Sequence, residues 1–145
     1  MKIKRKAGFL ISQIHQIAGR KFARKLKKHK IKINPGQGRI LFALWEKDGI
    51  SIRDLAKRTS LGKSTISSML KRMRNEGYIR LEHPPDNERT KLVYVLQQSK
   101  EIESAFEKLA EEMNNIYYKG FIDEEIKEFE DNLERVLQNL KEDKD

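Results

Sequence analysis

Short hydroxyl side chains alternate with long cationic ones along residues 62–75, a combination suited to binding an anionic polymer. The apolar residues of this stretch follow the i, i+3, i+4, i+7 spacing of one helix face: Ile66, Met69, Leu70 and Met73. The other side of the same helix carries Lys63, Ser64, Ser67, Ser68, Lys71 and Arg72. Residues 62–75 contain no Asp or Glu, and the first acid after them is Glu76, whereas a solvated helix usually mixes Glu with Lys. An ordinary amphipathic core helix would share the apolar stripe, so the neighbouring elements must decide between the two interpretations.

The charge of the chain is divided between its two ends. Residues 1–96 hold 24 Lys and Arg against 7 Asp and Glu, a net +17, whereas residues 97–145 hold 7 against 15, a net −8. A basic body joined to an acidic C-terminal segment indicates an anionic partner for the body. Nucleic acid is the first candidate for that partner and an anionic membrane surface is the second.

Composition disfavours several other classes of protein. With no cysteine, the 145 residues form neither a disulfide nor a thiolate metal site, which fits the reducing cytoplasm where we expect the protein to act. No apolar run approaches about 18 residues, so we expect no membrane-spanning helix. The three histidines, His15, His29 and His83, are scattered, and no nucleophile–base or carboxylate pair stands at a useful spacing. We therefore expect no enzyme, no bound metal and no cofactor.

Three helices are predicted before the stretch at 62–75. Residues 7–30 form the first, and its C-terminal half is rich in Lys and Arg, as suits the negative end of a helix dipole. The second begins at Pro35, because Asn34 is a good N-cap and Gln37 at the third position completes a capping box. Ser51 caps the short third helix, with Asp54 at its third position.

A tight connection at residues 59–61 joins the third helix to the fourth, which makes a helix-turn-helix. Gly77 then ends the fourth helix, and the apolar period changes from 3.6 to 2 at residues 79–82. Residues 83–90 contain two prolines and form a loop, and residues 92–96 return as a β-rich strand. This is a hairpin directly after a helix-turn-helix, the arrangement called a wing. Two more amphipathic helices follow, at residues 100–119 and after an expected cap at Asp123.

In this order of elements the chain resembles the MarR family of winged helix-turn-helix transcriptional regulators, over nearly its whole length. The resemblance is carried by INPGQGRILFAL at 33–44, SIRDLAKRTSLGKSTISSMLKRMRNEGYI at 51–79 and DNERTKLVYVL at 86–96. Three positions depart from the family pattern. Ser60 stands where the turn usually has glycine, Gly62 replaces the usual polar cap, and Asn87 occupies the place of the aspartate in the wing's Asp-x-Arg motif.

The resemblance implies a mainly α fold with a small β-hairpin wing, in which a winged helix-turn-helix core is combined with N- and C-terminal dimerisation helices. It divides the chain into an N-terminal dimerisation helix at 1–32, a DNA-binding region at 33–97 and C-terminal dimerisation helices at 98–145, together one intertwined domain. It also implies a homodimer that straddles a pseudo-palindromic operator in double-stranded DNA. The function implied is that of a sequence-specific regulator, a repressor relieved by a small-molecule ligand.

On this interpretation the fourth helix enters the major groove and the wing approaches the minor groove. Arg89 is the candidate for the minor groove, Arg53 and Arg72 are expected to meet phosphates, and the other contacts come from the exposed face of the fourth helix and the wing. The full set of expected DNA-binding residues is Arg53, Lys63, Ser64, Thr65, Ser67, Ser68, Lys71, Arg72, Arg89 and Lys91. Two alternatives stay open from the sequence: a winged helix used for protein or RNA contact, and a basic membrane-surface binder without operator binding.

Overall fold

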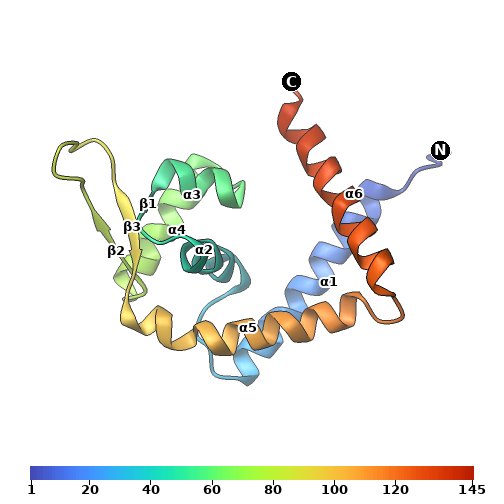
Figure 1. Cartoon of the computed structure of the whole chain (residues 1–145), viewed down its shortest axis with the longest axis horizontal. Helices are drawn as coiled ribbons and strands as arrows, with labels where there is room; N and C mark the ends of the chain where they lie inside the picture. Colours follow the sequence, from blue (N-terminus) through green and yellow to red (C-terminus); the bar gives the residue numbers. More distant parts are fainter. The chain divides into compact units, whose positions relative to one another are not determined.

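The computed structural model describes all residues, 1–145, and consists of two compact parts, residues 1–110 and 111–145. The helices are α1 (Ala7–Lys28), α2 (Pro35–Glu46), α3 (Ile52–Thr59), α4 (Lys63–Asn75), α5 (Gln97–Tyr117) and α6 (Asp123–Glu142). The strands are β1 (Ile50–Ser51), β2 (Ile79–Glu82) and β3 (Leu92–Val95) (Figure 1). The fold is therefore mainly helical with a small sheet, as predicted.

The core of the first part lies where α2, α3 and α4 meet one face of the sheet. Its fully buried side chains include Ile40, Leu41, Leu44, Leu55, Ile66, Leu70, Met73 and Val93. α2 starts with the predicted capping box: Asn34 Oδ1 accepts the N–H of Gln37 at 2.8 Å, and Gln37 Oε1 accepts the N–H of Asn34 at 3.0 Å. These bonds fix the entry of the chain into the central helix of the core.

The connection between α3 and α4 sets the angle of the helix-turn-helix. Ser51 Oγ accepts the N–H of Asp54 at 3.1 Å and caps α3 as predicted. Ser60, at the end of α3, adopts φ 57° and ψ 26°, the left-handed conformation that glycine usually takes in this turn. Gly62 then precedes α4 without a side-chain cap. The chain thus reverses between two helices in three residues, at the cost of one left-handed serine.

The sheet has three strands, in the order β1–β3–β2, all antiparallel. The expected hairpin is β2 and β3, with Ile79 opposite Val95 and Leu81 opposite Val93. Strand β1 was not predicted, because two residues are too short to show a period of two and the same residues also start α3. It pairs Ile50 with Val93, so the wing is anchored to the residues that cap α3.

α5 is attached to the core through a close approach to α2. The helix starts at Gln97 rather than at Lys100 as expected, and the Ser99 hydroxyl donates to the Tyr78 carbonyl at 2.5 Å in a buried position. Farther along, Phe106 and Leu109 are buried. A Cβ added to Gly38 of α2 would lie 2.5 Å from Cε2 of Phe106, so only glycine lets this ring lie so close to the α2 backbone.

The second part contains the end of α5 and α6. The rings of Tyr118, Phe121 and Phe129 form an edge-to-face cluster, with centroids 5.8–6.3 Å apart. The Tyr118 hydroxyl donates to Glu130 at 2.5 Å, and this bond raises the pKa of Tyr118 to about 12. The expected cap at Asp123 is wrong by one residue, because Ile122 is the N-cap and its N–H donates to the Glu125 carboxylate at 3.0 Å.

α6 has no buried residue, although its apolar side chains follow one face. These exposed residues are Phe129, Leu133, Val136, Leu137 and Leu140. α1 likewise exposes Phe9, Leu10, Ile11, Ile14 and Ile17 before its C-terminal end is buried at Leu26. No helix is long and apolar enough to cross a membrane.

The contact between α2 and Phe106 gives a test of the fold. We expect Gly38→Ala to lower the free energy of unfolding by about 1–3 kcal/mol, because the added methyl group must displace the Phe106 ring. The matched control is Gly19→Ala in α1, where nothing lies within 4 Å of the added Cβ and helix propensity alone should stabilise by up to about 1 kcal/mol. Urea denaturation of the two variants measures both effects, and an unchanged midpoint for Gly38→Ala would contradict the close packing.

Candidate nucleic-acid interface

α4 presents two different faces, as its sequence predicts. Ile66, Leu70 and Met73 are at most 1% exposed and face the core, and Met69 packs at its edge. The exposed residues of the other face are Lys63, Ser64, Thr65, Ser67, Ser68, Lys71 and Arg72. α4 contains no Asp or Glu, so this surface combines positive charge with neutral hydrogen-bonding groups.

The hydroxyl groups on this face are not engaged in hydrogen bonds within the protein, so they are available to a ligand. Thr59, in α3, donates its hydroxyl back to the carbonyl of Leu55 at 2.8 Å, the usual arrangement for a threonine inside a helix. The hydroxyls of Ser64, Thr65, Ser67 and Ser68 have no such partner in the protein. Because each hydroxyl can both donate and accept, the surface can match several patterns of donors and acceptors on a ligand.

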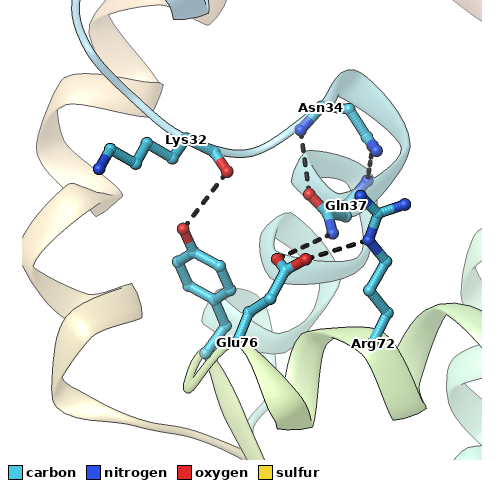
Figure 2. Close-up of polar contacts among 6 residues, drawn as sticks. Lys32, Asn34, Gln37, Arg72 and Glu76 are labelled. Carbon is cyan, nitrogen blue, oxygen red and sulfur yellow. Dashed lines mark hydrogen bonds and ion pairs between the residues drawn. The ribbon is translucent and has the colours of Figure 1, made fainter.

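Arg72 is the one cation of the α4 face that is held by a neighbour. Its Nε lies 3.0 Å from Glu76 Oε1, and the other oxygen of this carboxylate lies 3.5 Å from Nε2 of Gln37. Figure 2 shows the Glu76 carboxylate between the Gln37 amide and the Arg72 guanidinium. The Arg72 side chain is nevertheless 71% exposed, so its terminal nitrogens stay available. Glu76 thus links the capped start of α2 to the α4 face.

The loop of the wing carries the next group of predicted residues, and it extends away from the helices in Figure 1. Asn87 Oδ1 accepts the backbone N–H of Arg89 at 3.0 Å, and its Nδ2 donates to the Thr90 hydroxyl at 2.8 Å. Asn87 therefore shapes the loop through the backbone and does not hold the Arg89 guanidinium. The side chains of Arg89 and Lys91 are exposed without a protein partner.

Not every cation near the wing is free. Arg80 of β2 forms an ion pair with Glu82, and its guanidinium also lies 4.2 Å from the centre of the Tyr94 ring. The Arg80 side chain is therefore engaged within the sheet, and it is not among the unpaired cations. Arg53, in the first turn of α3, is exposed and has no ion-pair or hydrogen-bond partner in the protein.

The predicted residues therefore occupy three elements of the same compact part: α3, α4 and the wing loop. Seven of the ten share the exposed face of α4. Arg74, which the sequence prediction left out, is also exposed, and it lies seven residues after Ser67. Residues seven apart share a helix face, so the same periodicity that located the apolar stripe would have found it.

Comparison with known proteins agrees with this architecture. Residues 33–91 match the sequence model of the MarR family. No curated protein matches the sequence.

Solved structures match the fold over nearly the whole chain. A MarR transcriptional regulator from Methanosarcina mazei is 24% identical, with a TM-score of 0.81 over 96% of this chain and 92% of that one. A mutant of MarR from E. coli, solved in complex with operator DNA, is 22% identical, with a TM-score of 0.80 over 90% and 92% of the two chains. The S. aureus MepR–DNA complex is also 22% identical, with a TM-score of 0.81 over 96% and 99%.

Proposed function

Because residues 33–91 of the chain match the sequence model of the MarR family, we propose that the protein is a transcriptional regulator that binds double-stranded DNA in a sequence-specific manner. It acts by binding and carries out no catalysis, and it works in the cytoplasm. Two of the structures that share its fold are complexes with DNA, which supports this proposal.

The observation that carries the proposal is the exposed face of α4. A helix in the major groove needs side chains short enough to let it approach and groups able to reach base edges. Ser64, Ser67 and Ser68 meet the first need, and Lys63 and Lys71 meet the second. Lysine can donate to guanine, whereas serine accepts several bases, so base readout through this face is moderate rather than stringent.

The remaining predicted residues position the protein on the duplex. Arg53 and Arg72 donate to phosphates, which fixes the register of α4 without reading sequence. Arg89, whose guanidinium has no protein partner, enters the minor groove from the wing, with Lys91 beside it. Since Asn87 holds the backbone of Arg89, the loop presents this side chain at a defined place.

We also propose that the protein is a homodimer formed through its terminal helices. The exposed apolar stripe of α6 and the exposed apolar residues of α1 are too extensive for helices that remain in water. A second copy of the chain would cover them. The two DNA-binding lobes of the resulting dimer, one from each subunit, would bind a pseudo-palindromic operator. By resemblance to the family, we propose a repressor that is relieved by a small-molecule ligand.

The experiment that tests this function is selection of bound duplexes from a random library. We expect enriched sequences with two related half-sites, about one helical turn or 34–36 Å apart. Anionic lipid vesicles and single-stranded RNA serve as competing ligands. Binding to vesicles or RNA without binding to duplex DNA would refute the proposal.

The wing gives a more local prediction. We expect Arg89→Ala to weaken binding to the selected duplex by about 1–3 kcal/mol, because the minor-groove contact is lost. Arg135→Ala, on the exposed surface of α6, is the control and should leave affinity unchanged. Fluorescence anisotropy measures both variants. Equal affinity of Arg89→Ala and the wild type would remove Arg89 from the interface.

The proposed dimer has its own test. We expect Leu133→Glu, in the apolar stripe of α6, to weaken dimerisation by about 2–4 kcal/mol, because a carboxylate would be buried in the interface. Gln138→Glu introduces the same group on the opposite face of α6 and should leave the dimer intact. Analytical ultracentrifugation distinguishes the species, and a dimeric Leu133→Glu would place the interface elsewhere.

A further inference from the structure

An open cleft of about 540 Å³ lies beside α4, on the side where α2 begins. It is lined by the C-terminal part of α1, the connection between α1 and α2, the first turn of α2 and the C-terminal end of α4. Arg72 and Glu76 belong to its wall. Arg72 is therefore shared between the cleft and the exposed face of α4, and the two surfaces are continuous.

The cleft is strongly positive. Its charged lining consists of Lys27, Lys30, Lys32, Arg72 and Glu76, a net charge of +3. The single carboxylate is already occupied, because its two oxygens face Arg72 and Gln37 (Figure 2). Lys27 and Lys30 have no ion-pair or hydrogen-bond partner for their ammonium groups in the protein. The Lys32 side chain is directed away from Arg72 and Glu76 in Figure 2, which leaves Lys27 and Lys30 as the lysines that can act together with Arg72.

Lys30 occupies a position where glycine would be more stable. Its φ of 58° is left-handed, and it ends α1 in a Schellman arrangement: Ile31 N–H donates to Leu26 O at 2.9 Å, and Lys30 N–H donates to Lys27 O at 3.0 Å. A left-handed residue other than glycine costs about 1–2 kcal/mol. The chain thus carries a cation at the cleft at a cost to its own stability, which points to a role outside folding.

We propose that this cleft binds the phosphodiester backbone of the duplex, with Lys27, Lys30 and the free terminal nitrogens of Arg72 as the binding groups. The inference rests on the proposed function, because it requires α4 in the major groove. A helix that enters this groove, about 12 Å wide, has a phosphate chain along each side. A Cβ added to Gly36 would lie 3.1 Å from the Met69 side chain, so the start of α2 lies against α4, and Arg72 of α4 lines the cleft beside it.

The proposal is tested by the salt dependence of binding to a random-sequence duplex about three helical turns long. Each phosphate contact contributes about 0.9 to the slope of log affinity against log salt concentration. Each subunit of the proposed dimer loses two contacts, so we expect Lys27→Gln with Lys30→Gln to lower that slope by about 3–4. The ratio of affinities for the selected and random duplexes should stay the same, because phosphate contacts carry no sequence information.

Two matched variants separate a local contact from general charge and from folding. Lys141→Gln with Lys144→Gln removes the same charge from the C-terminal segment and should change the slope little. Lys30→Gly removes the cation and relieves the left-handed backbone, so it should bind the duplex more weakly while its melting temperature stays equal or rises. A Lys30→Gly variant that binds as tightly as the wild type would overturn the assignment of Lys30.

The outcomes also separate this inference from the proposed function. If the wild type binds the duplex and the variant with Lys27→Gln and Lys30→Gln shows an unchanged slope, the assignment of the cleft as a phosphate site is overturned. The proposed function as a DNA-binding regulator is then unaffected. Equal loss in the two double variants overturns it too, because the effect would then be one of total charge. Calorimetric titration with inorganic phosphate, showing binding that depends on Lys27 and Lys30 while duplex affinity does not, would make the cleft a site for free anions instead.

Discussion

Burial of one apolar stripe on α4 determines where every other functional group of this helix points. Ile66, Leu70 and Met73 are at most 1% exposed, and burying each of them is worth about 1.5–3 kcal/mol. A shift of one residue would turn the helix by about 100°, which would expose this stripe and bury serines and lysines in its place. No gain at the polar face offsets that cost, because an exposed hydroxyl or ammonium group contributes little to folding. The hydroxyl and cationic groups are therefore held outward by the core, and Lys63 and Lys71 need no support of their own.

The same division explains what the sequence could predict. Amphipathic periods and capping residues act within four residues of each other, so α2 with its Asn34–Gln37 box and α4 with its polar face were found from the sequence. Strand β1 was missed because its two residues bond to β3, more than 40 residues away, and leave no local pattern. The cleft beside α4 was missed for the same reason, since Lys30 and Arg72 come together only through tertiary packing. Local sequence rules predicted the helices and the polar face of α4. Surfaces built from several elements, such as the cleft, could be identified only from the folded structure.

The cations of the winged region fall into three classes that composition does not distinguish. Arg80 is used internally, because it pairs with Glu82 and covers the Tyr94 ring. Arg72 is partly used, since Glu76 holds its Nε and leaves the terminal nitrogens exposed. Arg53 and Arg89 have no such partner. The count of 24 Lys and Arg over residues 1–96 therefore overstates the number of cations available to an anionic ligand. Within the winged region the free groups lie on α3, on α4 and in the wing loop.

Two non-glycine residues with left-handed backbones, Ser60 and Lys30, lie in the connections that lead into α4 and α2. Each costs about 1–2 kcal/mol, a noticeable share of the 5–15 kcal/mol by which a domain of this kind is stable. The two differ in what the side chain offers in return. Ser60 follows directly from the short turn between α3 and α4, where the backbone must reverse whatever residue is present. At Lys30 the Schellman bonds would form equally well with glycine, so the backbone gains nothing from the lysine. What lysine adds over glycine at this position is its ammonium group, and Lys30 is one of the residues that line the positive cleft.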